Sequence, residues 1–343
     1  MAVLRRKWCD NATIRQCARR RDETGQLARA SDIRDSPRYE ENGETMTDAG
    51  LTLLTCSIER DRDIFAVLAK SIDENVDPSV RHVVVVPGKD VRAFAQFASP
   101  QRDIVAQEDI LPIRLFQLPK QLRALSFLSS SFRRPIYLTP KLRPMRGWMI
   151  QQILKIEFAR TCPTPAVMHV DSDVFFVRGL QGADAYRQGK VTFFEADSGQ
   201  PMPQHRPWID AAAACLGLSV PPTHARHYIE NCVMWDRDVT RDMVARIEAH
   251  TGRFWVDALL DQPTISEYFI YGLYIDYVCG PDRVAVETQS YCNSFWPEQG
   301  AFEIDQLLAR LKPKHCAFAV QSTEGVEADE RLAVYDAARR ALS

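Results

Sequence analysis

Residues 166–180 of the 343-residue chain, AVMHVDSDVFFVRGL, decide the class of fold. A short apolar run, Ala166–Val170, ends in two aspartates, Asp171 and Asp173, and a second apolar run, Val174–Val177, follows at once. Two carboxylates at positions i and i+2 beside a buried strand cost free energy unless a positive charge compensates them. Mg²⁺ and Mn²⁺ prefer such hard oxygen ligands and often bridge carboxylates to a diphosphate. We therefore predict a divalent-cation site at the end of this strand; the alternative is a solvated turn in which the aspartates cap the backbone.

The sequence before this stretch predicts a β-α-β unit. The apolar run Leu51–Ile58 predicts a buried strand, a helix follows around Ile64–Ile72, and His82–Val86 predicts a second strand that ends at a Pro-Gly turn. An amphipathic helix at Met145–Arg160 leads into the strand before the aspartates. We expect further strands at 113–118, 191–195, 232–235 and 316–320, and helices at 208–216, 239–250, 265–278, 304–311 and 328–342. The chain is therefore predicted to be a mixed α/β protein whose helices dominate its later part.

The first residues differ in composition from the rest. Residues 1–48 mix basic and acidic side chains and contain few large apolar ones, so they cannot bury enough surface to offset the entropy of ordering. Met46 stands just before the first strand and is an alternative start of translation. We expect a disordered N-terminal extension over 1–48, a single catalytic domain over 49–322 and a C-terminal helical tail over 323–343.

Charge and cysteine content exclude several classes of protein. The chain has 43 Lys and Arg against 45 Asp and Glu, a net charge of −2, which excludes the strongly basic surface of a dedicated nucleic-acid-binding protein. No apolar run approaches the roughly 20 residues of a membrane helix, and the N-terminus lacks the apolar core of a secretory signal. The nine cysteines form no C-x-x-C pair, which favours a reducing compartment. These observations predict a cytoplasmic protein.

Three further segments strengthen the prediction for the Asp-x-Asp motif, which resembles the metal-binding motif of GT-A-fold glycosyltransferases. RGWMIQQILKIEFA (146–159) resembles the helix before this motif in several bacterial sugar-transferase families. YIENCVMWDRDV (228–239) and ISEYFIYGLY (265–274) resemble segments of DUF6492, an uncharacterised bacterial family of the GT-A group. The likeness covers residues 51–321. It implies a GT-A-like, Rossmann-like mixed sheet flanked by helices, and an enzyme that moves a sugar from a nucleotide-diphosphate-sugar to a hydroxyl acceptor.

The resemblance also assigns metal ligands. Asp173 becomes the direct ligand of Mn²⁺ or Mg²⁺ and a catalytic residue, while Asp171 contacts the metal through water or binds the ribose. The cation acts as a Lewis acid on the leaving diphosphate. His315, which opens a late strand, is a candidate third ligand; the alternative is an ordinary structural histidine.

Other residues are candidates for binding the donor. Arg146 and Lys155, on the helix before the motif, could reach the diphosphate, although both could also be solvated positions on an amphipathic helix. Ser57, Arg60 and Asp61 follow the first strand, at the edge where the resemblance places the nucleoside. Their alternative role is a charged turn in which the aspartate caps the next helix.

The acceptor and the proton transfer have candidates as well. Glu230 and Asn231 precede the apolar run CVMW and could bind donor or acceptor hydroxyls, or form a plain turn. Glu267 stands among aromatic residues, which would raise its pKa and suit a general base that deprotonates an acceptor hydroxyl. Asp257 and Asp261 compete with it for that role. The resemblance implies a saccharide or glycolipid acceptor and leaves room for peripheral contact with a membrane.

Two other functions remain open at this point. Phosphohydrolases of the haloacid-dehalogenase type also carry Asp-x-Asp after a strand, and Asp171 would then be the nucleophile. They usually carry it in their first strand, whereas here a β-α-β unit precedes it. A nucleotide- or carbohydrate-binding module without activity is the third possibility, although both aspartates of the motif are present.

Overall fold

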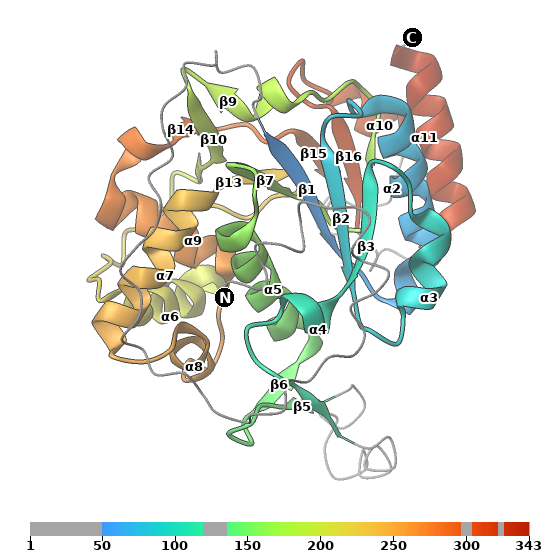
Figure 1. Cartoon of the computed structure of the whole chain (residues 1–343). Helices are drawn as coiled ribbons and strands as arrows, with labels where there is room; N and C mark the ends of the chain where they lie inside the picture. The colour runs from blue at the N-terminus through green and yellow to red at the C-terminus, as the bar shows by residue number, and fades with distance from the viewer. Residues whose placement is uncertain (1–49, 119–135, 296–303, 322–325, 343) are drawn as a thin grey trace, which may run out of the picture. The chain divides into compact units, whose positions relative to one another are not determined.

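A five-stranded sheet forms the centre of the structure, a computed structural model that describes residues 50–118, 136–295, 304–321 and 326–342 (Figure 1). In spatial order its strands are β13 (Val233–Asp236), β7 (Ala166–His169), β1 (Leu51–Cys56), β2 (Arg81–Val86) and β3 (Arg102–Ala106). Four of them are parallel, and β13 is antiparallel to β7. The carboxyl ends of the parallel strands therefore meet at one edge of the sheet, which is also the edge where β13 begins.

Both faces of this sheet are buried. Neighbouring residues of a strand face opposite sides, so Leu54 and Val167 belong to one apolar core while Leu53 and Met168 belong to the other. The first core is completed by α5 (Gly147–Thr161), α6 (Arg206–Leu216), α7 (Arg237–Thr251) and α9 (Glu267–Tyr274), and the second by α2 (Arg62–Asn75). Figure 1 shows these two helical layers on opposite sides of the strands. Burial on both faces explains why the central strands are continuous apolar runs.

The chain leaves the central sheet directly after the two aspartates. The apolar run that follows them forms β8 (Val174–Phe176), which pairs with β16 (Ala317–Val320), itself paired with β15 (Cys292–Phe295). A third apolar core joins this small sheet to α2 and to α11 (Ala328–Leu342), through residues such as Phe175, Phe318 and Tyr335. The C-terminal helix thus packs against both α2 and the sheet that begins at the Asp-x-Asp turn.

The remaining elements are short. The strands are β4 (Phe116–Gln117), β5 (Ile136–Leu138), β6 (Pro144–Arg146), β9 (Tyr186–Arg187), β10 (Lys190–Phe194), β11 (Ala196–Asp197), β12 (Arg226–His227) and β14 (Ala285–Glu287). The helices are α3 (Val91–Phe94), α4 (Gln107–Ile110), α8 (Trp255–Leu260) and α10 (Ile304–Ala309), the π-helix η7 (Ile275–Cys279), and the 3₁₀ turns η1 (Glu59–Asp61), η2 (Ala95–Phe97), η5 (Gly182–Ala185), η6 (Pro203–His205) and η8 (Pro281–Arg283).

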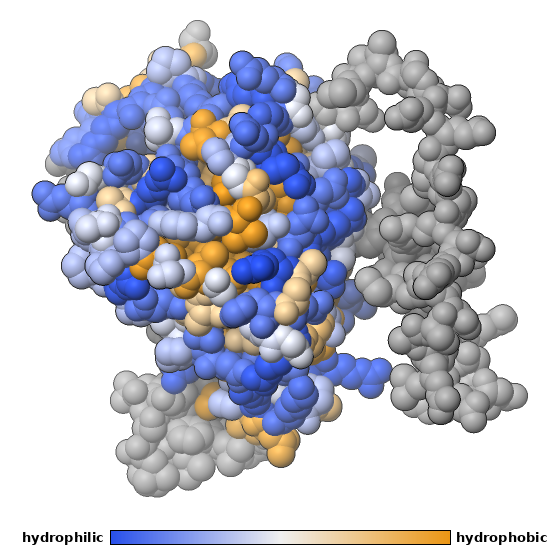
Figure 2. Space-filling view, turned by 90° about the vertical axis from the view of Figure 1, so that its left-hand side faces the viewer, coloured by the Kyte–Doolittle hydropathy of each residue, from blue (hydrophilic) through white to orange (hydrophobic). Residues whose placement is uncertain are grey.

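The predicted α/β class, a mixed sheet flanked by helices, is confirmed. The strand predicted over 113–118 is reduced to β4, and β3 is an additional strand. The predicted extension over 1–48 and the alternative start at Met46 lie outside the described residues. Within the described ranges, no helix is both long and apolar enough to cross a bilayer. Figure 2 views the side on which α6, α7 and α8 lie in Figure 1 and shows a stripe of apolar residues surrounded by hydrophilic ones.

Candidate active site

Asp171 and Asp173 lie in the turn between β7 and β8, at the carboxyl edge of the central sheet. The N–H of Val170 donates to the carbonyl of Leu54 (2.9 Å), so the strand stays paired up to the residue before the turn. The side chain of Asp171 is 38% exposed. Asp173 is 8% exposed. One carboxylate therefore faces solvent, where a ligand can reach it, while the other is held inside the edge.

A buried ammonium group lies next to this turn. The Nζ atom of Lys155, on α5, is 3.5 Å from Oδ1 of Asp171 and 3.3 Å from Oε1 of Glu267. It also donates a hydrogen bond to the hydroxyl of Tyr268 (3.1 Å) and lies 4.9 Å from the centre of that ring. The structure thus brings together three of the residues that the sequence singles out, namely Lys155, Asp171 and Glu267.

Burial and charge oppose each other in this cluster. Burial raises the pKa of Glu267, and the positive charge of Lys155 partly counteracts that rise. For Lys155, burial acts to lower the pKa, but Asp171, Tyr268 and Glu267 together hold it well above its ordinary value. The backbone N–H of Glu267, at the start of α9, is satisfied by Oε1 of Gln152 (3.0 Å). The ammonium of Lys155 therefore offsets part of the cost of burying the Glu267 carboxylate.

The end of β1 contributes a serine to the same edge. Ser172, between the two aspartates, donates from its hydroxyl to Oγ of Ser57 (2.8 Å), which is buried. Arg60 and Asp61 follow in η1 and pair with each other (3.1 Å), with the arginine side chain 79% exposed. Ser57 is therefore tied to the Asp-x-Asp turn, and the Arg60–Asp61 pair lies on the solvent side of the strand-to-helix connection.

Glu230 and Asn231 lie at the same edge because β13 runs antiparallel to β7. Asn231 is buried and Glu230 is half-buried, and both bond to Ser294 of β15: the Asn231 amide donates to its hydroxyl (3.2 Å), and that hydroxyl donates to the Glu230 carboxylate. Burial raises the pKa of Glu230, and its hydrogen bonds with Ser294 and the Asn231 N–H act in the opposite direction. The pair links the start of β13 to the end of β15.

His315 and Arg146 are among the predicted residues that are not brought to this cluster, as are Asp257 and Asp261, which pair with Lys141 and Arg143. His315 precedes β16, whose other end meets the motif, where the Val320 N–H donates to the carbonyl of Asp173 (3.3 Å). The direction of β16 therefore places His315 at the far end of the strand. Arg146 caps the start of α5 and is exposed; it is nine residues before Lys155, about 13 Å along a helix at 1.5 Å per residue.

The carboxylates at the turn fit a cation whose remaining ligands come from a substrate. In the described ranges, no group of three or more His, Cys, Asp or Glu side chains is arranged to hold a metal ion. Asp171 and Asp173 supply two hard carboxylates, one of them accessible and one buried. Mg²⁺ is commonly held by one or two carboxylates together with substrate phosphates, so these residues suit a cation shared with a diphosphate rather than a closed protein cage.

Three residues of this region are not among the candidate site residues from the sequence, where Gln152 was expected only to pack or to line the site. Tyr268 adjoins Glu267 in the chain, and Gln152 lies one turn of helix from Lys155, so both had a positional signal. Arg331, on α11, had none. It is 1% exposed, and it donates to the carbonyls of Val320, Gln321 (3.1 Å) and Val326 (2.9 Å). Burial lowers the pKa of Arg331, and the negative charge of Asp173 counteracts that effect.

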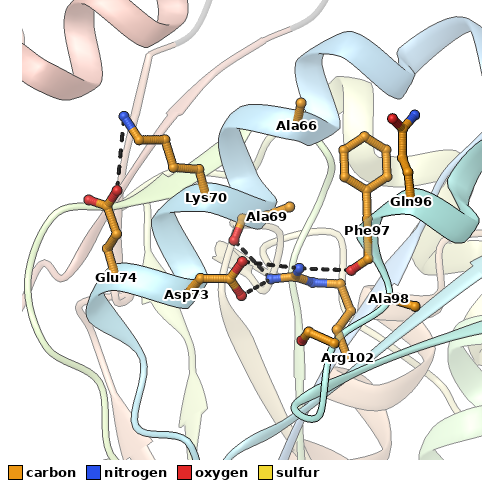
Figure 3. A pocket seen from close by; sticks show the side chains of 10 residues that line it. Ala66, Ala69, Lys70, Asp73, Glu74, Gln96, Phe97, Ala98 and Arg102 are labelled. Atoms are coloured by element: carbon orange, nitrogen blue, oxygen red, sulfur yellow. Dashed lines mark hydrogen bonds and ion pairs between the residues drawn. The ribbon is translucent and has the colours of Figure 1, made fainter.

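A cavity of about 460 Å³ lies elsewhere, between α2, η2 and β3 (Figure 3). Arg102 at its base is committed to Asp73 (2.6 Å), to His82 (2.9 Å) and to the carbonyls of Ala69 and Phe97. Arg102 is the first residue of β3, so the cavity is at the amino end of the parallel strands, opposite the aspartates. The ion pair between Arg102 and Asp73 at this cavity therefore joins β3 to α2.

Comparison with known proteins assigns the chain to a family. A family model described as "Family of unknown function (DUF6492)" matches residues 51–325. The chain belongs to this family. The resemblance that the motifs indicated is thereby confirmed for DUF6492, and the matched residues include the Asp-x-Asp turn, Lys155 and Glu267. No curated protein sequence matches this DUF6492 member.

Solved structures of glycosyltransferases also match. The galactosyltransferase LgtC, in complex with donor and acceptor sugar analogs, is 12% identical, with 83% of this chain and 95% of that chain covered and a TM-score of 0.42. An active-site mutant of LgtC gives the same identity and coverage and a TM-score of 0.45. Mouse xyloside xylosyltransferase 1, in its apo form, is 11% identical, with 80% and 99% covered and a TM-score of 0.40. The family model, and not these structures, carries the assignment.

Proposed function

We propose that this DUF6492 protein is a metal-dependent glycosyltransferase, which moves a sugar from a nucleotide-diphosphate-sugar to a hydroxyl of a saccharide or glycolipid. The observation that supports this most is the convergence of Asp171, Asp173, Lys155 and Glu267 at the carboxyl edge of the central sheet. In open α/β sheets, ligands bind at that edge.

The two aspartates would hold the cation. Asp173 is the proposed direct ligand and Asp171 binds through water or contacts the ribose; Mn²⁺ or Mg²⁺ at this position would neutralise the negative charge that develops on the leaving diphosphate. His315 is left out of the ligand set because it precedes β16, at the end of that strand away from the aspartates. The nucleoside would lie along the end of β1, near Ser57, Arg60 and Asp61.

Lys155 has a different role in this proposal from the direct diphosphate contact expected from the sequence. Its side chain is 6% exposed, and its ammonium contacts Asp171, Glu267 and Tyr268. It therefore positions both carboxylates and stabilises the charged form of Glu267. Arg146, at the exposed start of α5, stays a candidate for contact with the donor.

Glu267 is the proposed proton acceptor. Burial raises its pKa, which brings a carboxylate closer to the pH at which general bases work best, and Lys155 keeps it ionised. It would take the proton from the acceptor hydroxyl as that oxygen attacks the anomeric carbon and the bond to the diphosphate breaks. Glu230 and Asn231 would bind hydroxyls at the same edge, and we expect the reaction to take place in the cytoplasm.

A thermal-shift experiment tests this proposal. The purified chain is melted with UDP or GDP, with and without Mn²⁺. A ligand present at 100 times its Kd stabilises a protein by about 2.7 kcal/mol, so a clear rise in Tm is expected when nucleotide and metal are both present. Asp173→Asn should abolish the metal-dependent part. Asp336→Asn, a matched loss of a 45% exposed carboxylate on α11, should retain it.

The alternatives give different results in the same laboratory series. A phosphohydrolase would turn over p-nitrophenyl phosphate and lose that activity on Asp171→Asn. A binding module would bind nucleotide or sugar without hydrolysing or transferring from any donor. Absence of a metal-dependent shift with every nucleoside diphosphate would contradict the glycosyltransferase proposal.

A further inference from the structure

We infer that Trp148, His205, Trp208 and His227 form an aromatic platform that binds the acceptor saccharide beside Glu267. That the bound saccharide is the acceptor rests on the proposed function. The platform itself is defined by the geometry of its four rings. None of the predicted site residues belongs to it, and it lies next to the start of α9.

The rings of the platform form a connected row. Trp148, in the first turn of α5, lies 6.4 Å from Trp208 in α6, measured between ring centres. Trp208 is stacked on His205 at 5.4 Å and 25°, and His205 is 6.5 Å from His227 of β12. These contacts join three segments that are far apart in the sequence: α5, the start of α6, and β12.

The row has a buried support and an open side. Phe269 of α9 is 0% exposed and touches two of the rings, His205 at 5.1 Å and Trp208 at 6.0 Å. Trp148 is 50% exposed, and the other three platform residues are half-buried. Trp148 is thus held by Trp208 on one side while half of its surface stays open to a ligand.

The platform is uncharged at neutral pH. Burial lowers the pKa of His205 and also that of His227, so both imidazoles are neutral. A neutral aromatic surface does not favour an anion such as a nucleotide phosphate. It does suit a pyranose ring, which has apolar C–H faces that pack on aromatic rings and hydroxyls at its edge that stay in water.

Three connections place the platform beside the proposed proton acceptor. The indole N–H of Trp208 donates to Oγ1 of Thr264 (3.1 Å), three residues before Glu267. Trp148 lies one helical turn before Gln152, whose side chain accepts the Glu267 N–H. Phe269, under the rings, is two residues after Glu267 in the same helix. A sugar on the platform would therefore lie near the start of α9, the helix that carries the proposed proton acceptor.

Saturation-transfer NMR on the full chain tests the inference. The probes are methyl β-D-glucopyranoside, methyl β-D-galactopyranoside and N-acetylglucosamine, each without nucleotide. We expect saturation transfer to the ring protons of at least one pyranoside. Trp148→Ala should weaken the affinity for that pyranoside by about 10-fold and so remove the signal, because a half-buried aromatic contact contributes about that much to binding. Trp148→Phe should keep the signal. Phe254→Ala is the matched control, since Phe254 is 39% exposed, directly precedes α8 and lies outside the platform.

The outcomes separate this inference from the proposed function. No transfer to any pyranoside, or equal transfer in wild type and Trp148→Ala, overturns the platform. A Trp148-dependent response to phosphatidylglycerol vesicles in place of sugars also overturns it, because the face would then contact lipid. Metal-dependent binding of UDP or GDP, measured separately, decides the glycosyltransferase proposal whatever the sugar result is.

Discussion

Replacing Lys155 with methionine keeps a long buried side chain and removes its positive charge. Glu267 then faces the interior with its side chain 6% exposed and its ion-pair partner gone, and Tyr268 loses the donor to its hydroxyl. Asp171 is less affected, because its side chain is 38% exposed and can be hydrated. The lost compensation therefore falls mainly on one buried carboxylate.

The loss of unfolding free energy can be estimated from this one buried carboxylate. Removing one partner of a buried ion pair costs about 3–5 kcal/mol, and the exposure of Asp171 puts this case at about 3 kcal/mol. The cost depends on pH, because Glu267 can take up a proton. Burial already raises the pKa of Glu267 in the native protein, and without Lys155 that rise is larger.

The sign of the pH dependence is fixed by linkage. A carboxyl whose pKa is higher in the folded than in the unfolded state stabilises the fold below its unfolded pKa, and this contribution is lost as the pH rises through the folded pKa. Lys155→Met should therefore lose about 3 kcal/mol of unfolding free energy at about pH 8 and clearly less at about pH 5. Urea denaturation at both pH values measures this.

Lys141→Met is the matched control. Lys141 is 66% exposed and pairs with Asp257 at the surface (2.6 Å), so its loss should cost less than about 1 kcal/mol and should not change between the two pH values. If Lys155→Met costs less than about 1 kcal/mol, or costs the same at both pH values, the ammonium does not compensate buried carboxylates and the reasoning fails.

Three further predictions address packing and activity. A Cβ at Gly272 would lie 2.3 Å from Cγ of Tyr228, so Gly272→Ala should lower the unfolding free energy by about 2 kcal/mol or more in a thermal melt; an unchanged Tm would contradict that contact. Arg331→Met leaves three carbonyls without their hydrogen-bond donor and should lower the unfolding free energy by about 3 kcal/mol in urea denaturation. Arg339→Met, at a 46% exposed side chain, should lower it by less than about 1 kcal/mol. Glu267→Gln should lower kcat about 100-fold or more while donor affinity is kept, and a full kcat would exclude it as the proton acceptor.

The sequence predicted best those elements whose signal is local. The strand before the aspartates was predicted at Ala166–Val170 and is found at Ala166–His169, and the last helix was predicted at 328–342 and is found at Ala328–Leu342. Fully buried strands and long amphipathic helices carry their pattern within a few residues. By contrast, β3 was missed because its first two residues, Arg102 and Asp103, interrupt the apolar run; both are held by ion pairs with distant residues.

Long-range pairing decided what the sequence could not. The apolar run at Val174–Val177 was visible, but nothing local shows that it pairs with β16, more than a hundred residues later. The same pairing determines the fate of His315. Its residue type suited a metal ligand, and the direction of β16 places it away from the aspartates. Ligand chemistry can be read from residue types, whereas the end of a strand at which a residue lies depends on the partner strand.

The environment of Lys155 also depends on long-range packing that the sequence does not show. Its position on an amphipathic helix allowed either a solvated or a donor-binding lysine, and the structure shows neither environment. Only the packing of α5 against α9 reveals that the ammonium meets Glu267, 112 residues later, together with Asp171. Because two carboxylates share this ammonium, the proposed cation at the aspartates would have to supply the positive charge that a diphosphate needs.

The C-terminal helix bears on the aspartates although the family match ends at residue 325. Arg331 of α11 donates to the carbonyls of Val320 and Gln321 at the end of β16. The N–H of Val320 in turn donates to the carbonyl of Asp173 (3.3 Å). A chain of hydrogen bonds therefore runs from the buried side chain of Arg331, outside the family match, through the backbone of β16 to the backbone of Asp173. We therefore expect α11 to help hold the backbone of Asp173, the proposed metal ligand, in place.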